Sequence, residues 1–149
     1  MNPRTGIYEF MDLRAQSLES PAYCTVFSLD FDLDGGTPAW HCADIPFVFH
    51  NSYRVANCNI EGVTEKLEEE VAGAYVNFAR TGNPNHANMP EWKPYTAEDP
   101  ATMIFDRTSR CETDFDRELS RLRTELGPQR PPFNFAPPAE DEDGPAWMY

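Results

Sequence analysis

Residues 63–84 read VTEKLEEEVAGAYVNFARTGNP, and this stretch decides how the chain folds. Its apolar side chains recur at steps of three and four, a spacing that predicts an α-helix over residues 63–80. The apolar positions are Val63, Leu67, Val71, Ala74, Tyr75 and Phe78, and the acidic positions, expected to face solvent, are Glu65, Glu68, Glu69 and Glu70. Arg80 in the last turn, followed by Gly82 and Pro84, predicts where the helix ends.

Upstream of this helix, residues 22–33 alternate in a way that predicts a β-strand. One face carries Tyr23, Thr25, Phe27, Leu29, Phe31 and Leu33, and the other carries Cys24, Val26, Ser28, Asp30 and Asp32. The first half is apolar on both faces, as in a strand buried inside a sheet, whereas the second half turns carboxylates toward water.

Flanking segments complete the expected organisation. Residues 6–19 predict a short amphipathic helix that stops at Ser20-Pro21, because proline disfavours helix in the residue before it. Residues 83–100 hold four prolines and are expected to form an ordered loop. Residues 101–106 form a short apolar run that predicts another strand.

A final helix is expected after Thr113, which resembles a capping box with Asp116 three positions on. Its apolar stripe is Phe115, Leu119, Leu122 and Leu126, and Gly127-Pro128 ends it. The chain therefore divides into an N-terminal helix or linker (1–21), a central segment (22–127) and a proline-rich acidic tail (128–149).

Composition excludes several classes of protein. The chain has 149 residues, 12 Lys+Arg against 25 Asp+Glu, and a formal net charge of -13. Such a charge repels nucleic acid and anionic membrane surfaces, so neither is expected as a partner. Without a run of about 20 apolar residues or a signal peptide, we expect a cytoplasmic protein. Its four cysteines, Cys24, Cys42, Cys58 and Cys111, are then expected to be free thiols.

Metal sites are not expected. Residues 30–35 match the opening of a calcium loop, but the twelfth position, which should be a bidentate Glu, is His41, and the aspartates lie on a predicted strand. The histidines and cysteines include no Cys-x-x-Cys or His-x-x-x-His pair of the kind that binds zinc.

A catalytic nucleophile is also missing from the sequence, because no serine has the Gly-x-Ser-x-Gly surroundings of an α/β-hydrolase elbow. Cys42 lies beside His41 in an expected extended loop, where their side chains would point apart. His41 itself would ordinarily be a satisfied, partly buried side chain. However, the order strand, loop, histidine, apolar turn and long helix is where an α/β-hydrolase places its base.

Four segments carry a resemblance to a known family. Residues 39–49 (AWHCADIPFVF) resemble the histidine-bearing motif of the type-B carboxylesterases, the group of the cholinesterases and bacterial para-nitrobenzyl esterases. Residues 75–85 (YVNFARTGNPN), 90–95 (PEWKPY) and 101–106 (ATMIFD) look like later motifs of that family, in the same order.

The resemblance implies an α/β protein that forms the C-terminal part of an α/β-hydrolase fold, with an incomplete sheet. His41 would be the general base of a carboxylic ester hydrolase that needs no cofactor, while the family's serine, acid and oxyanion loop precede the matched part. Asp44 stands where the family usually has Glu, so its shorter carboxylate would weaken a supporting hydrogen bond near the histidine or mark divergence from catalysis.

Two interpretations remain open. In the first, the chain is inactive alone and supplies His41 to a companion chain that carries the serine nucleophile. In the second, it is a non-catalytic interaction subunit or a remnant of a hydrolase. Both predict a partner chain or self-association, because a strand that is apolar on both faces needs cover.

Overall fold

The computed structural model describes residues 3–16 and 20–127, which contain both helices and strands. The helices are α1 (Pro3–Ala15), α2 (Ile45–Val48), α3 (Thr64–Thr81) and α4 (Arg117–Glu125), with two 3-10 turns, η1 (Ser52–Arg54) and η2 (Ala56–Cys58). The strands are β1 (Cys24–Phe27), β2 (Ala101–Phe105) and β3 (Arg110–Thr113). The predicted acidic tail and positions 17–19 lie outside the described residues.

The strands form a mixed sheet in the order β1-β2-β3. Strand β1 runs parallel to β2, with Cys24 opposite Thr102 and Phe27 opposite Phe105. Strand β3 then pairs antiparallel with β2. The central strand β2 is buried along its whole length, as expected for a strand with neighbours on both edges and cover on both faces.

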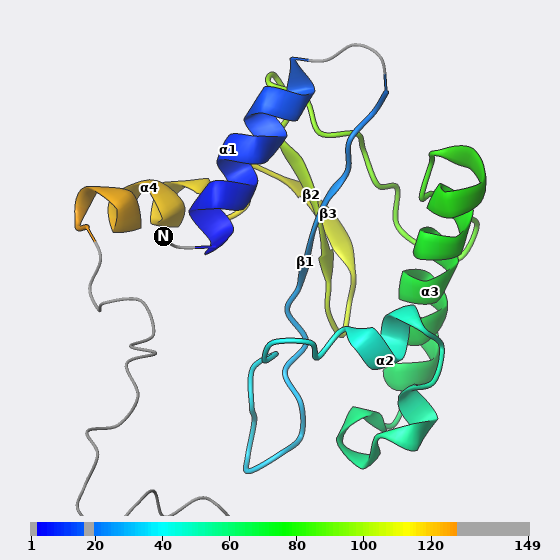
Figure 1. The fold of residues 1–149 in the computed structure, drawn as a ribbon. Helices are drawn as coiled ribbons and strands as arrows, with labels where there is room; N and C mark the ends of the chain where they lie inside the picture. Colours follow the sequence, from blue (N-terminus) through cyan, green and yellow to red (C-terminus); the bar gives the residue numbers. More distant parts are fainter. Residues whose placement is uncertain (1–2, 17–19, 128–149) are drawn as a thin grey trace, which may run out of the picture.

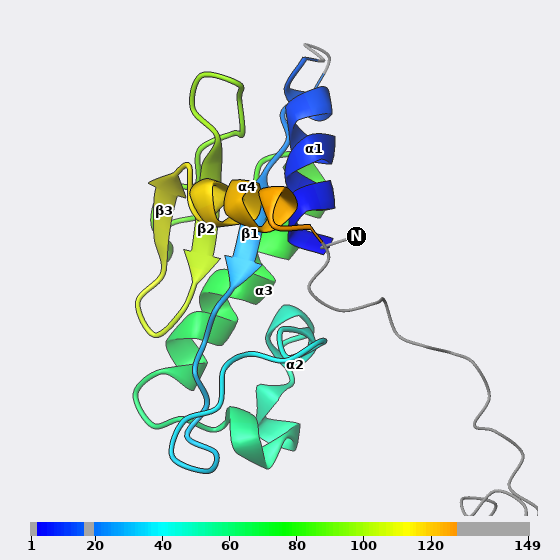
Figure 2. The same ribbon diagram turned by 90° about the vertical axis from the view of Figure 1, so that its left-hand side faces the viewer.

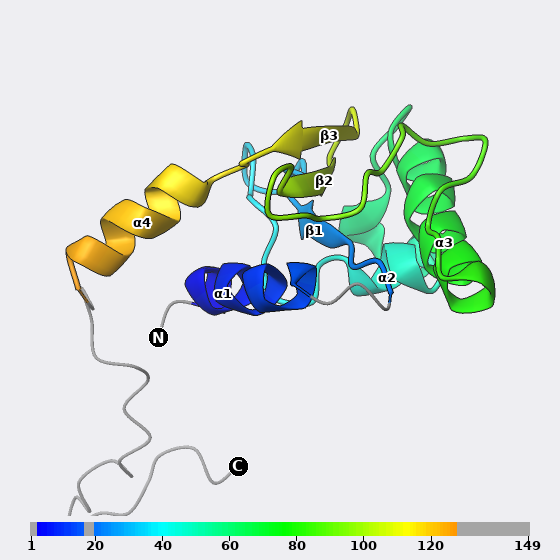
Figure 3. The same cartoon turned by 90° about the horizontal axis from the view of Figure 1, so that it is seen from above.

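Helices cover both faces of this sheet. In Figure 1, α1 and α4 lie on one side of the strands, and α2 and α3 on the other. Figure 2 shows α4 crossing in front of the strands and α3 behind them, and Figure 3 shows the same separation from above. The larger core cluster, which includes Phe47, Leu67, Val71, Met103 and Phe105, joins the sheet to α2 and α3. Met11, Cys24 and Tyr95 form a smaller cluster beneath α1.

Strand β1 is shorter than the sequence predicts. The strand expected over 22–33 ends at Phe27, and its last ladder bond runs from Ser28 N to Phe105 O, at 2.8 Å. Strand β2 itself ends at Phe105, and among the described residues the next pairing of this segment is an isolated bridge between Phe31 and Thr37. The predicted faces are nevertheless confirmed beyond the strand: Leu29 and Phe31 are fully buried, and Asp30 and Asp32 are exposed.

Helix α3 is confirmed almost to the residue. It ends at Gly82, whose φ of 75° is left-handed and whose N–H donates to Phe78 O at 2.8 Å. Glycine suits this position because it adopts positive φ without a steric cost.

The expectation that the acidic side of α3 faces solvent is wrong for Glu68 and Glu70, which are buried. Each lies one position from an inward-facing apolar residue, and each carboxylate has partners. Glu70 accepts a hydrogen bond from the Ser109 hydroxyl at 2.5 Å and lies 3.6 Å from Lys66 Nζ. The pair ties α3 to the turn between β2 and β3.

Helix α4 exists, but its predicted capping box is wrong. The Thr113 hydroxyl donates to the Asp99 carboxylate at 2.5 Å instead of to the helix, and Asp116, in the left-handed region at φ 64°, precedes the first helical residue. Residues 110–113 form strand β3, which the sequence pattern did not predict. The helix therefore starts later than expected.

The apolar stripes of the two outer helices are largely exposed. The exposed members are Ile7, Phe10 and Leu13 on α1, Leu119 and Leu122 on α4, and Leu126 at the C-terminal cap of α4. Tyr8 and Met11 are the side of α1 that is buried.

Asp12, Tyr95 and Arg117 connect α1, the loop before β2, and α4. Tyr95 Oη donates to Asp12 Oδ1 at 2.7 Å, and Arg117 Nη2 donates to the same oxygen at 2.7 Å. The hydrogen bond from Arg117 lowers the pKa of Asp12 below its ordinary value of 3.8.

Replacing Ser109 by Ala is expected to lower the free energy of unfolding by about 2 kcal/mol, because it removes a hydrogen bond to a buried carboxylate. Urea unfolding followed by circular dichroism measures this. The neighbouring exposed Thr108→Ala is the matched control and should change stability little. Equal stability of the two variants would contradict the role assigned to Glu70.

The free energy of unfolding should decrease in acid, because protonation of Asp12 weakens its contacts with Tyr95 and Arg117. Its folded-state pKa is lowered, so the stabilisation is present above pH 3.8 and is lost as pH falls through the lower folded value. Asp12→Asn should therefore reduce the melting temperature at pH 6 and flatten its decline below pH 4. Asp30→Asn, at an exposed carboxylate, is the control, and an identical decline in both variants would count against the Asp12 contact.

Candidate functional site

His41 lies in a tight turn that precedes α2. The turn is closed by Ala43 N donating to Trp40 O at 3.1 Å, and the next by Ile45 N donating to Cys42 O at 3.2 Å. The His41 side chain is exposed, and within residues 3–16 and 20–127 its imidazole makes no hydrogen bond or ion pair. His41 is therefore not the satisfied, partly buried side chain that a histidine in such a sequence would ordinarily be.

Aromatic packing holds the turn in place on either side of the histidine. The Trp40 ring packs on Phe31, with centroids 4.5 Å apart, and Phe47 in α2 packs on Phe27 at 5.2 Å. Helix α2 is a single turn with Pro46 in its first positions, where a missing N–H costs nothing. The histidine is therefore exposed on a fixed backbone.

Cys42 is exposed and has a φ of 70°, in the left-handed region that non-glycine residues rarely adopt. The other cysteines differ: Cys24 and Cys58 are buried, Cys111 is half-buried, and all four are unpaired thiols. Burial raises the pKa of the Cys24 and Cys58 thiols, and the charge of Glu68 adds to the effect at Cys58.

Asp44 begins α2 through its backbone, since its carbonyl accepts from Phe47 N and Val48 N, both at 3.0 Å. Its side chain makes no capping hydrogen bond. The charge of Asp44 affects Tyr75 on α3. Burial raises the pKa of the Tyr75 phenol, and the Asp44 carboxylate is the second cause of that increase. Among the described residues, no hydrogen bond joins Asp44 to His41.

A second polar cluster follows the turn, and the sequence did not indicate it. Glu68 on α3 accepts from Ser52 N at 2.7 Å, and its other oxygen lies 3.5 Å from His50 Nδ1. The contact fixes the chain just after α2. Only the fold brings these residues together, so no motif could have revealed them.

Of the aspartates that resembled a calcium loop, Asp32 pairs with Arg107 at 2.5 Å. Among the described residues, no group of three or more His, Cys, Asp or Glu side chains is arranged to hold a metal ion. Nor does any helix in that part of the chain combine the length and apolar character needed to cross a bilayer.

The helix–sheet–helix arrangement and the motif around His41 define an α/β-hydrolase type of protein. The family model described as "Carboxylesterase family" matches residues 1–125 of the 149. The chain belongs to the carboxylesterase family, as the resemblance in the sequence indicated.

Curated relatives support the same assignment. The para-nitrobenzyl esterase of Bacillus subtilis is 31% identical over 103 residues, which cover 64% of this chain and 21% of that protein. The phenmedipham hydrolase of Pseudarthrobacter oxydans is 33% identical over 76 residues, covering 48% of this chain and 15% of the relative. The matched part thus spans about a fifth or less of these relatives.

Solved structures share the fold. An esterase from Clostridium hathewayi is 40% identical, with a TM-score of 0.67, over 70% of this chain and 21% of that chain. A carboxylesterase of Geobacillus stearothermophilus is 31% identical, with a TM-score of 0.65, over 78% of this chain and 24% of that chain. The expected part of an α/β-hydrolase fold is confirmed.

Thiol chemistry tests how open the His41 turn is. With Ellman's reagent, the native chain is expected to show one fast thiol, Cys42, a slower Cys111, and two thiols that react only on unfolding. Burial and raised pKa values explain why Cys24 and Cys58 react only on unfolding. Cys42→Ser should remove the fast phase, while Cys111→Ser, the control, should leave it. A native chain without a fast thiol would mean that the turn is covered.

Proposed function

We propose that this chain is the C-terminal segment of a serine carboxylesterase and supplies His41 as the general base. The serine nucleophile, the acid and the oxyanion donors would lie on a separate companion polypeptide or on sequence joined upstream. The chain alone is then inactive toward esters. The observation that carries the proposal is the exposed imidazole of His41 on a fixed turn, within the motif that resembles the family's.

The chemistry assigned to His41 follows from its position. As the serine oxygen attacks the ester carbonyl, the imidazole takes the hydroxyl proton, and it then donates this proton to the departing alcohol. Water repeats the sequence in the second half-reaction and releases the acid. A base must lie within hydrogen-bond reach of the nucleophile, so an imidazole free on its outer side suits a serine brought by another segment.

The acid must also come from outside this segment. A triad histidine needs a carboxylate on its second nitrogen to hold the working tautomer. Among the described residues Asp44 makes no hydrogen bond to His41, and Glu68 is engaged by His50 and Ser52. Neither acid is placed for that role, which supports an assembly in which serine and acid arrive together.

The exposed apolar stripes of α1 and α4 favour a second candidate, a non-catalytic interaction subunit derived from a hydrolase. Phe10 is 61% exposed, Leu13 67% and Leu126 70%, and apolar surface gathered in this way marks interaction sites. A binding subunit needs these faces but does not need His41. The two candidates therefore separate at the histidine.

Activity should appear only in the assembly. We expect no hydrolysis of para-nitrophenyl acetate above background by the chain alone, and turnover when it is produced with the polypeptide encoded directly upstream. His41→Ala should reduce kcat of the assembly by at least about 10³-fold, because a triad without its base retains only residual catalysis.

His50→Ala is the matched control, since His50 is an exposed histidine nine positions away that pairs with Glu68 instead. It should leave kcat within a few-fold. Full activity of His41→Ala in a stable assembly would overturn the catalytic assignment. An assembly that forms but hydrolyses no ester would favour the interaction subunit.

A further inference from the structure

The two edges of the sheet differ in chemistry. Strand β3 forms one edge and carries the charged residues Arg110 and Glu112, which are the kind of side chain that keeps an edge from pairing with other chains. Strand β1 forms the other edge and has the sequence CTVF, with no charged residue and no proline. The free edge of β1 therefore lacks the features that protect a strand edge left open to solvent.

The backbone of β1 offers unused hydrogen-bonding groups at this free edge. Ser28 N donates to Phe105 O at 2.8 Å, so Val26, two positions earlier, also directs its N–H and C=O toward β2. Because alternate residues of a strand direct these groups to opposite edges, those of Thr25 and Phe27 face away from β2. Among the described residues, the N–H and C=O groups of Thr25 and Phe27 have no hydrogen-bond partner.

We propose that the free edge of β1 pairs with an extended strand of the companion polypeptide, the one that carries the serine nucleophile. The inference rests on the proposed function and adds where the companion binds and through which atoms. Main-chain hydrogen bonds to an open strand edge are a recurring mode of polypeptide recognition. The open groups of Thr25 and Phe27 therefore identify the occupant as an extended polypeptide segment.

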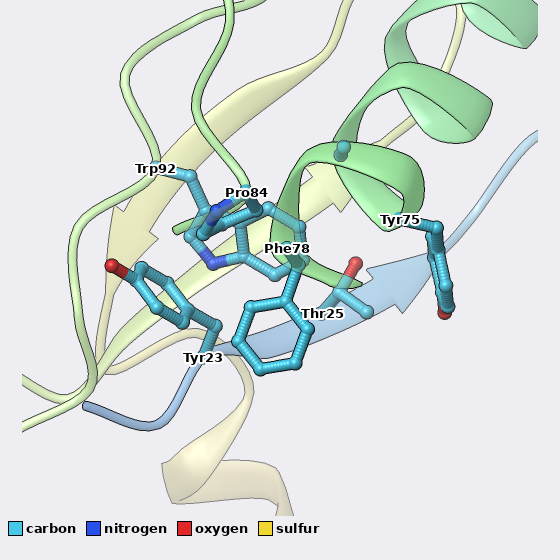
Figure 4. Close-up of a pocket in the computed structure, with 7 residues that line it drawn as sticks. Tyr23, Thr25, Tyr75, Phe78, Pro84 and Trp92 are labelled. Carbon is cyan, nitrogen blue, oxygen red and sulfur yellow. The ribbon is translucent and has the colours of Figure 1, made fainter. Parts of the chain in front are cut away.

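A hollow of about 160 Å³ lies beside this edge, between β1 and α3. Figure 4 shows it between Thr25 of β1 and the rings of Tyr75 and Phe78 of α3. Trp92 packs on Phe105 of β2 at 5.6 Å and closes the side toward β2, whereas Tyr75 and Phe78 are exposed. The hollow is therefore open on the side of the free edge, where a side chain of the added strand would lie.

The size of the hollow specifies the side chain that fits. An apolar protein cavity of about 150 Å³ accommodates benzene, the ring of a phenylalanine. Thr25 Oγ1 already donates to Met103 O at 2.9 Å, so this wall offers no free hydroxyl hydrogen. Side chains of a strand alternate between its faces, so every second one would point toward α3. We expect a leucine, isoleucine or phenylalanine of the companion strand at the position beside Thr25.

A second copy of this chain fits the edge less well. It would bring its own β1, whose Tyr23 and Phe27 rings already pack on Phe78 and Phe47 of that copy, with centroids 5.9 Å and 5.2 Å apart. Those side chains are not available to enter the hollow of another molecule. The net charge of -13 on each copy also opposes self-pairing. A different polypeptide is therefore the favoured occupant.

Hydrogen exchange of single amides tests the proposal on the full chain, alone and with the polypeptide encoded directly upstream. In the chain alone, the Thr25 and Phe27 amides should exchange fast, whereas Val26, bonded to β2, should exchange slowly. In the assembly, the Thr25 and Phe27 amides should slow at least about 100-fold, because each becomes part of a paired strand. ¹H–¹⁵N NMR spectra resolve the individual amides, and Val26 is the internal control.

A proline substitution removes one donor at the free edge. Thr25→Pro deletes the outward N–H and leaves the ladder with β2 in place, because proline is accepted on the outer side of an edge strand. Thr25→Val is the matched control, since it also loses the hydroxyl bond to Met103 but keeps the N–H. Measured by titration calorimetry, Thr25→Pro should bind the companion at least about fivefold more weakly than Thr25→Val.

The outcomes separate this proposal from the catalytic one. An active assembly in which the Thr25 and Phe27 amides still exchange fast would overturn the edge pairing and leave the catalytic assignment intact. Slow exchange of these amides in an inactive assembly would support the edge pairing and contradict only the catalytic assignment. Failure of the two polypeptides to associate, or protection that grows with the concentration of the chain alone, would overturn the companion as the occupant. Because the exchange comparison needs no variant, a Thr25→Pro chain that fails to fold leaves the test intact.

Discussion

The parallel pairing of β1 with β2 is the constraint on which the rest of the structure depends. It joins segments about 78 positions apart, as in the contact between Thr25 and Met103. Everything between them, including the His41 turn and α3, is a crossover connection that must return to the same sheet. A closed crossover leaves the turn little freedom, and the packing of Trp40 on Phe31 removes more.

Sequence predicted the elements whose cause is local. The period of α3 and its stop at Gly82 are properties of neighbouring residues, and they are confirmed. The end of β1 at Phe27 depends instead on where β2 ends, and β3 forms because it pairs with β2 in a hairpin. The residues of β1 and β3 alone therefore could not predict these two features. Glu70 was misassigned for the same reason, because its partner Ser109 lies 39 positions away.

The residues of the candidate site also separate into those that a local sequence pattern could predict and those that depend on long-range contacts. The motif around His41 was recognisable, since its residues are consecutive and their order resembles a family pattern. The hydrogen bond between Glu68 and Ser52 was not, because it joins segments that meet only in the folded chain. Consecutive motifs thus indicate the chemistry of a site, and long-range contacts determine how its residues are positioned.

The exposed leucines of α4 bear on how copies of the chain behave together. Apolar faces of this kind attract one another, whereas a net charge of -13 keeps like molecules apart. Colloidal behaviour is then set by solvent: salt shortens the range of the repulsion, and acid removes it as carboxylates become protonated. The net negative charge thus opposes association between copies of the chain through the exposed apolar faces of the outer helices.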